Sequence, residues 1–392
     1  MMTSGANKKN KSSWYVVGVD VWLAVSFLLL ISIGAIMVAS SSIAVAENST
    51  NDAFYYFKRH ILFIGLGSVF GVLMMSISSD WMSRLSRPAL ILGILALVLV
   101  LVPGIGVEVN GARRWINLGV SRFQVVEAIK LALIMSLATY VVKYKKGIQN
   151  SMLGVLRPLV VVAFIAGLLL VQPDFGSAVL LMIITLVMVY IAGARYRDLT
   201  VISLLAGSAM MVIAWAEPYR VKRLVNFVDP WQDPFNAGFQ LVQALIAVGR
   251  GEITGVGVGS SIQKLFYLPE AHTDFIFAVY AEEMGFLGVL VMIALFLLLI
   301  YRIFKIARNA FDQGNDFAGF MCTGIAVWLA LQAFLSMGVN LGMLPTKGLT
   351  LPFISSGGSA IMMNIIALSV VFRISYENRK IQYRMSKEEA SA

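Results

Sequence analysis

The stretch LPEAHTDFIFAVYAEEMGFLG, residues 268–288, decides the fold, because it starts as a polar loop and turns into an apolar run. The apolar run extends over 275–301, and about 20 consecutive apolar residues are enough for a helix to span a membrane. Asp274 lies where the loop ends, and Glu282 and Glu283 lie inside the run. Ionisable residues inside such a run cost about 2.5–3.5 kcal/mol on insertion scales and usually mark function.

Similar apolar blocks recur along the chain of 392 residues, which is 59% hydrophobic and 13% charged. Soluble proteins average about 25% charged residues, so a membrane protein is indicated. We predict ten transmembrane spans, at 22–45, 61–79, 88–103, 124–142, 158–172, 175–194, 199–216, 275–301, 317–344 and 357–373. The predicted fold is an all-α polytopic membrane protein, in which residues 22–373 form one membrane domain. We expect residues 1–21 and 374–392 to be disordered cytoplasmic tails.

Lysine and arginine are distributed unevenly over the segments between the predicted spans. With the N-terminus inside, the inner segments hold 19 of these residues and the outer segments hold 11. The positive-inside rule therefore places both termini in the cytoplasm. This bias accounts for the net charge of +10, and we expect no nucleic-acid partner. The single cysteine, Cys322, lies within a span, which excludes a disulfide framework and a cysteine metal site.

Three segments on the predicted outer side stand out. The first, residues 102–130, leads from span three into span four, and the third, residues 341–360, leads from span nine into span ten. The second, an extracytoplasmic loop over 217–273, is far longer than a typical connection and too rich in apolar residues to be disordered. Because all three fall on one side, the functional face is predicted to be extracytoplasmic.

The second segment contains a predicted amphipathic helix. Its apolar residues share one helical stripe, namely Phe235, Phe239, Val242 and Ile246. Gln240 lies on a neighbouring polar stripe, so we expect the helix to lie in the membrane interface. The glycine-rich sequence GVGVGSS, residues 255–261, follows. Since it lacks the GK[ST] ending of a phosphate-binding loop, a hinge or close backbone packing is favoured over nucleotide binding.

Two interpretations are open for each acidic residue near the start of span eight. Asp274 is equally compatible with a general base, strengthened by partial loss of water, and with a cap for the following helix. Glu282 and Glu283 follow eight and nine residues later. For these two, ion pairing that fixes helix packing is favoured over a proton or substrate path.

The basic residues near span four raise a similar choice. Glu127 and Lys130 are one helical turn apart, so they can pair with each other. Alternatively, Lys130 joins Arg122, Arg113 and Arg114 in binding an anionic headgroup, because arginine side chains match the geometry of phosphate oxygens.

Two further features give weaker signals. Lys347, in the third segment, is either solvated or part of an anion site formed with the neighbouring SSGGS backbone. The only two histidines, His60 and His272, are distant in the sequence and do not indicate a metal site.

Several long motifs together resemble the SEDS family (shape, elongation, division, sporulation). They are NGARRWINLG, QPDFGSA, DPWQDP, GFQLVQALIAVGRGE, QKLFYLPEAHTDFIFAVYAEEMGFLG and LPTKGLTLPFISSGGS. They cover nearly the whole chain, and DPWQDP, GRGE and TKGLTLPF favour the division branch over the elongation branch. The resemblance implies a ten-span peptidoglycan glycosyltransferase that polymerises lipid II, located at the septum in the bacterial inner membrane with cytoplasmic termini.

The resemblance also implies roles for particular residues. The essential aspartate of the family's HTDF motif corresponds to Asp274. The family's functional basic residues around span four correspond to Arg122 and Lys130, with Glu127 between them.

Two positions depart from the family pattern. QVVE, residues 124–127, replaces the usual Q-P-[SA]-E, and Ser356 replaces a tyrosine. Loss of the proline is expected to relax the entry to span four, and loss of the tyrosine to alter a contact in the third segment. Neither departure removes the acid or the basic residues.

The predicted reaction is an inverting glycosyl transfer with Asp274 as general base. Because the donor carries its own diphosphate leaving group, we expect no organic cofactor. A divalent cation is compatible with this chemistry, although the sequence has no carboxylate cluster dedicated to one. The candidate substrate-binding residues are Arg113, Arg114, Arg122, Glu127, Lys130, Gln240, Glu270, His272 and Lys347. Loop capping is an equally good interpretation of Glu270 and His272.

The expected partners are lipid II in the membrane, a class B penicillin-binding protein transpeptidase and other division proteins. Two other functions would use the same features: a lipid II flippase with Glu282 and Glu283 as a relay, and a non-catalytic scaffold for the transpeptidase. The gathering of polar motifs on one side counts against a flippase, since alternating access needs gates on both sides.

Overall fold

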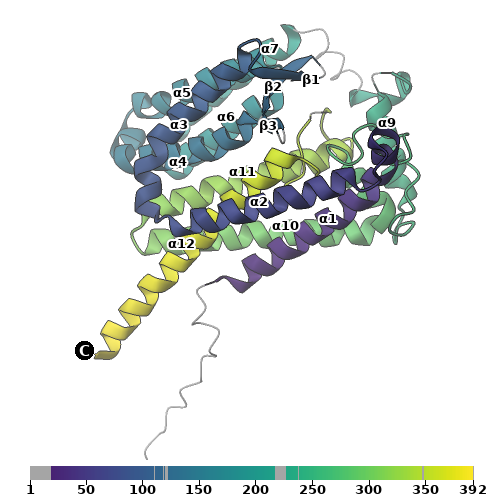
Figure 1. Cartoon of the computed structure of the whole chain (residues 1–392). Helices are drawn as coiled ribbons and strands as arrows, with labels where there is room; N and C mark the ends of the chain where they lie inside the picture. Colours follow the sequence, from purple (N-terminus) through teal and green to yellow (C-terminus); the bar gives the residue numbers. More distant parts are fainter. Residues whose placement is uncertain are drawn as a thin grey trace, which may run out of the picture.

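The computed structural model describes residues 19–109, 111–117, 119, 122–216, 227–236, 238–346 and 348–391. Long helices lie side by side in a bundle, and the few short strands lie toward one end of it (Figure 1). The long helices in these ranges are α1 (Val21–Thr50), α2 (Tyr55–Ser76), α3 (Ser79–Leu101), α4 (Val125–Asn150), α5 (Met152–Val171), α6 (Phe175–Ile191), α7 (Tyr196–Ala216), α10 (Ile276–Asp312), α11 (Asp316–Asn340) and α12 (Gly358–Ser391).

Each of the ten predicted spans overlaps one of these helices. Among the described residues, nine helices are long and apolar enough to cross a membrane. α6 has only 17 residues, which extend about 26 Å at 1.5 Å per residue, slightly less than the ~30 Å of a hydrocarbon core. The polytopic helical membrane fold is thus confirmed, whereas the number of ten spans stays a prediction.

The helices divide into central and peripheral ones. α4 and α11 lie in the centre, and most of their apolar side chains are buried by protein. By contrast, α2 and α3 expose large apolar side chains, such as Val72 at 63% and Leu92 at 65%. Large exposed apolar surfaces of this kind are expected where lipid tails cover the protein.

Polar side chains fix several helix ends. Asp20 caps α1, because its Oδ1 accepts a hydrogen bond from the amide of Leu23 at 3.0 Å. Arg302 of α10 also donates to Asp20, from its Nε at 3.1 Å. Asp174 caps α6 in the same way by accepting from the amide of Ser177 at 3.1 Å. These caps satisfy amides that a helix leaves without internal partners.

The first outer segment contains a small antiparallel sheet, which the all-α prediction did not include. Its strands are β1 (Gly106–Val109), β2 (Ala112–Asn117) and β3 (Arg122–Gln124), paired in that order. Trp115 in the middle strand pairs with Val107 on one side and with Gln124 on the other. Because β3 runs directly into α4, the sheet is anchored to the central part of the bundle.

The large loop contains a short helix η2 (Pro230–Gln232) and the helix α9 (Phe239–Arg250). The predicted apolar stripe is only partly correct. Phe235 precedes the helix and is 86% exposed, whereas Ala244 and Ala247 are fully buried. α9 packs against α10, and close packing selects small side chains rather than the larger ones that the periodicity indicated.

Two further expectations need correction. Span eight was predicted as one continuous helix, but α10 is interrupted at Gly285, which has φ 64° and ψ −169°. The C-terminal residues 374–392 were predicted to be disordered, but α12 continues as a helix to Ser391 (yellow in Figure 1). The helix continues because this region is rich in good helix formers and contains an Arg373–Glu377 pair at 2.8 Å.

Candidate active site

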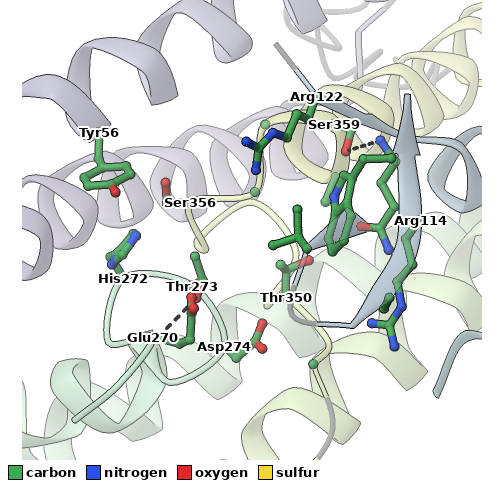
Figure 2. Close-up of a pocket in the computed structure, with 18 of the residues that line it drawn as sticks. Tyr56, Arg114, Arg122, Glu270, His272, Thr273, Asp274, Thr350, Ser356 and Ser359 are labelled. Atoms are coloured by element: carbon green, nitrogen blue, oxygen red, sulfur yellow. Dashed lines mark hydrogen bonds between the residues drawn. The ribbon is translucent and has the colours of Figure 1, made fainter. Parts of the chain in front are cut away.

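One cavity of about 1240 Å³ opens where the three outer segments meet (Figure 2). The sheet β1–β3 and the turn before α6 line one part, and the start of α2 lines another. The segments 270–275 and 345–350 and the first residues of α12 complete the lining. The convergence of all three segments agrees with their predicted placement on one side of the membrane.

The cavity brings together six of the residues predicted from the sequence. They are Arg114, Arg122, Gln240, Glu270, His272 and Asp274. A site of this volume can bury most of a large ligand, and its lining mixes aromatic, basic and acidic side chains.

Asp274 lies just before α10, with its half-buried side chain in the cavity (Figure 2). Gly348 of the third segment approaches it closely. A Cβ atom at this glycine would lie 3.1 Å from the Oδ2 atom of Asp274, a tight contact for a carbon atom. Glycine at 348 therefore gives the carboxylate the room it occupies.

Asn340 of α11 holds the start of α10. Phe275 occupies the N-cap position and makes no side-chain capping bond. Instead, Oδ1 of Asn340 from α11 accepts from the amide of Ala278 at 3.0 Å, and Nδ2 of Asn340 donates to the backbone carbonyl of Asp274 at 2.9 Å. These contacts join the first turn of α10 to α11 and fix the backbone that carries Asp274.

Hydrogen bonds from the third segment hold the residues that precede Asp274. The amide of Ser356 donates to the carbonyl of His272 at 3.0 Å, and Oγ of Ser355 donates to the carbonyl of Thr273 at 2.7 Å. Ser356, which stands where the family usually has tyrosine, makes this contact through its backbone.

Glu270 and His272 combine structural contacts with exposure to the cavity. Oγ1 of Thr273 donates to the Glu270 carboxylate at 2.5 Å, which is the loop-capping contact expected as an alternative. The His272 ring lies 4.6 Å from the ring of Tyr56 on α2. Burial lowers the pKa of His272 below its ordinary value, and the nearby Glu270 carboxylate opposes this shift. The ring is therefore neutral at physiological pH.

Arginines lie on two parts of the cavity wall. Arg114 on β2 donates from Nε to the carbonyl of Gln172 at 3.0 Å and also donates to the carbonyl of Pro173. These bonds connect the sheet to the turn before α6. Arg122 on β3 is exposed, and Arg59 on α2 lines the cavity from another side. The wall thus offers positive charge from separate elements.

Arg113 was predicted to bind substrate but does not line the cavity. It forms a partly exposed ion pair with Glu108 of the neighbouring strand at 2.9 Å. Lys347 lies outside the described residues.

Lys130 and Glu127 are paired with each other behind the cavity wall. Their charged atoms are 2.8 Å apart, and the Lys130 side chain is completely buried. Nζ of Lys130 also donates to Oε1 of Gln332 at 2.9 Å, while Nε2 of Gln332 donates to the carbonyl of Thr350 at 2.9 Å. Because Thr350 lines the cavity, Lys130 supports the wall through Gln332 and does not line it itself.

Several residues that line the cavity were not predicted from the sequence. They include Tyr56, Arg59, His60, Trp115 and Asp174. The available signal for the first three was the sequence YYFKRH, residues 55–60, which concentrates aromatic and basic residues at the start of a span.

The entry to α4 is held without the proline that the family usually has. The amide of Gln124, the N-cap residue, donates to Oγ of Ser359 at 3.2 Å. Among the described residues, no group of three or more His, Cys, Asp or Glu could hold a metal ion. No residue of the described ranges is therefore assigned to a divalent cation.

The family model described as cell cycle protein (FtsW, RodA, SpoVE) matches residues 21–380. A probable peptidoglycan glycosyltransferase FtsW from Xanthomonas oryzae is 46% identical over 368 residues, covering 94% of this chain and 75% of the relative. The protein of the same name from Coxiella burnetii is 43% identical over 370 residues, covering 94% and 99%.

Solved structures agree with these relatives. A chain from a peptidoglycan synthase complex that coordinates polymerization and crosslinking is 28% identical, with a TM-score of 0.75 and coverage of 92% and 99%. The rod shape determining protein RodA from Thermus thermophilus is 26% identical, with a TM-score of 0.67 and coverage of 92% and 98%. Because the family model spans nearly all of the described chain, this protein belongs to the SEDS family of FtsW, RodA and SpoVE proteins, on the branch of its FtsW relatives.

Proposed function

We propose that this protein is a peptidoglycan glycosyltransferase that polymerises lipid II during septal cell-wall synthesis. The observation that carries the proposal is the position of Asp274, whose carboxylate lies in a cavity of about 1240 Å³ that arginines also line. The relatives named above carry the same activity in their names, which supports the assignment.

Asp274 acts as the general base. It takes the proton from a sugar hydroxyl of the acceptor as the hydroxyl oxygen attacks the anomeric carbon of the donor. The bond between that carbon and the diphosphate oxygen breaks, and its electron pair leaves with the diphosphate. Attack from the face opposite the leaving group inverts the configuration. General-base assistance of this kind contributes roughly 10²–10⁴-fold.

The arginines stabilise negative charge that grows on the leaving diphosphate. Arg114 and Arg122 project from neighbouring strands, and Arg59 comes from α2 on another part of the wall. Both donor and acceptor carry a diphosphate, so cations on separate walls suit a site that binds two such lipids together. A fixed arrangement of donors needs little reorganisation during the reaction.

The partner is a class B penicillin-binding protein transpeptidase. Support comes from the similar chain in a complex that combines polymerization with crosslinking. Both termini lie in the cytoplasm, as the distribution of lysine and arginine favours. The protein acts at the septum, and the match to a family model described as cell cycle protein supports this location.

The decisive experiment substitutes Asp274→Asn, which preserves shape and removes the basic carboxylate. Purified protein, with and without the transpeptidase, is incubated with labelled lipid II, and polymer is measured by gel electrophoresis. We expect a loss of at least about 100-fold, within the range for a general base. Asp312→Asn, which changes an exposed acid at the far end of α10, serves as the control and should retain activity.

If Asp274→Asn formed polymer at the wild-type rate, Asp274 would not be the general base. Lipid II translocation in sealed vesicles without any polymer would point to a flippase. A variant that lacks polymerase activity yet supports division normally would point to a scaffold.

A further inference from the structure

The interruption of α10 at Gly285 changes the hydrogen bonding on both sides of it. In a continuous helix, the amide of Phe286 would donate to the carbonyl of Glu282, and the amide of Leu287 to the carbonyl of Glu283. The φ of 64° at Gly285 turns the chain away from this pattern. Two amides and two carbonyls therefore need partners from elsewhere.

Residues 252–257, which follow α9, provide these partners. The bonds run from Phe286 N to Glu252 O at 2.9 Å, from Leu287 N to Ile253 O at 3.1 Å, from Val256 N to Glu282 O at 3.0 Å and from Gly257 N to Glu283 O at 3.0 Å. The glycine-rich segment is thus inserted, through its backbone, between the two parts of α10.

Glycines make this insertion possible, because the two backbones nearly touch. A Cβ atom at Gly251 would lie 2.0 Å from the carbonyl oxygen of Ala281, and one at Gly255 would lie 2.2 Å from that of Glu283. Gly255 also has φ 80°, a conformation that other residues rarely adopt. Close backbone packing, one of the two alternatives for the glycine-rich sequence, is what the structure contains.

The carboxylate of Glu282 binds the same loop a second time. Its Oε1 accepts from the amide of Ile262 at 3.1 Å and from Arg250 at 3.3 Å, and its Oε2 accepts from the hydroxyl of Ser261. The Glu282 side chain is completely buried. A buried carboxylate with three donors holds its partners strongly, since each bond is charge-assisted.

The carboxylate of Glu283 connects the loop to α1. Its Oε1 accepts from Nζ of Lys264 at 2.7 Å and from the hydroxyl of Ser40 at 2.7 Å. Lys264 also donates to Oγ of Ser40 at 2.8 Å, so the three groups contact one another. Lys264 and Glu283 are 9% and 0% exposed, which makes this a nearly dry ion pair.

These contacts surround the short part of α10 that follows Asp274. Residues 276–284 form one helical piece between Asp274 and the break at Gly285. One end is held by Asn340, and the other by residues 251–264. Any displacement of that piece would shift the carboxylate of Asp274 within the cavity.

We propose that Glu282, Glu283 and Lys264, together with the inserted segment 251–257, are positioning residues that hold Asp274 in its reactive place. This inference rests on the proposed function, in which Asp274 is the base. It assigns the two buried glutamates to fixing the catalytic segment instead of carrying protons or substrate.

The first test is Glu283→Gln in the full-length protein, assayed with its transpeptidase partner on labelled lipid II. We expect kcat to fall at least about tenfold, since a misplacement of about 1 Å can cost about 100-fold. KM should stay within about twofold, because the cavity residues that contact substrate are unchanged. Asp312→Asn, which changes an exposed acid at the other end of α10, should keep both constants.

A second variant separates positioning from simple loss of stability. Lys264→Met/Glu283→Leu removes both charges, so no unpaired charge stays buried and the fold is retained. The proposal requires kcat to remain low in this variant, because the Lys264–Glu283 pair and the contacts of both residues with Ser40 are gone. A stable double variant with the wild-type kcat would overturn it.

Hydrogen exchange tests the proposal without substrate. In Glu283→Gln, amides of residues 251–284 should exchange faster while those of α4 and α11 stay unchanged. Uniform acceleration, or none, would overturn the positioning role. An inactive wild-type protein, or an active Asp274→Asn, would overturn the proposed function instead, and the exchange result would still decide the inference.

Discussion

Two buried lysine–glutamate pairs in this protein have nearly the same distance between their charged atoms, but one lies within a single helix and the other joins a loop to a helix. Lys130 and Glu127 are 2.8 Å apart on one turn of α4, and Lys264 and Glu283 are 2.7 Å apart but come from the loop and from α10. The first pair stiffens a central helix behind the cavity wall. The second fixes an interrupted helix next to Asp274. Similar ion pairs therefore serve local stability in one region and placement of a reactive group in the other.

Breaking the α4 pair should give the largest change in stability. Lys130→Met leaves Glu127 buried without its counter-charge, which should lower the free energy of unfolding by about 3–5 kcal/mol. Denaturant unfolding in detergent measures the change. The matched variant Lys130→Met/Glu127→Leu should recover most of the loss, because neither charge remains. If Lys130→Met were as stable as the wild type, the Lys130–Glu127 pair would not have the stabilising role assigned to it.

Lowering the pH should act on the Asp274 region through His272. Burial holds the pKa of His272 below its ordinary value of 6.5, so the unfolded chain binds its proton more readily. The contribution of neutral His272 to the free energy of unfolding is therefore fully present above pH 6.5 and is lost as the pH falls below this value. Thermal unfolding at pH 7.5 and pH 5.5 should show a larger decrease for the wild type than for His272→Gln. Equal decreases would contradict this expectation.

The exposed pair Arg113–Glu108 should give the smallest effect and provides a baseline for both buried pairs. Its side chains are 40% and 53% exposed, and exposed pairs contribute about 0–1 kcal/mol. Arg113→Gln should therefore change the free energy of unfolding by no more than this amount and leave the rate of polymerisation unchanged. Its neighbour in the sequence offers a contrast, since Arg114→Gln should slow polymerisation. Equal losses in the two variants would place Arg113 at the substrate after all.

The same comparison explains what could be predicted from the sequence. Hydropathy located the helices because spanning a membrane needs a long apolar run, and this property is local. The pairing of Lys130 with Glu127 followed from a spacing of three residues on a helix. The pairing of Lys264 with Glu283 had no such spacing rule, because it depends on the break at Gly285. The sheet β1–β3 was missed because its strands are short and do not alternate cleanly between apolar and polar residues.

The candidate site shows the same limit. Asp274 was identifiable from its place between loop and apolar run, and the motif resemblance supported it. Arg59 and His60 were not identified, although they line the same cavity, because α2 is far from Asp274 in the sequence. Arg113 was expected at the substrate from its charge, and Lys130 from its charge and the motif resemblance, whereas Arg113 pairs with Glu108 and Lys130 is buried against Glu127.

One consequence of α12 extends beyond the cavity. Its first residues, Gly358 to Ala360, line the site, and its last residue is Ser391. A helix of 34 residues measures about 51 Å at 1.5 Å per residue. It is therefore a stiff lever whose far end projects from the bundle (Figure 1). A protein that binds this far end and tilts the helix would therefore move the residues of α12 that line the cavity.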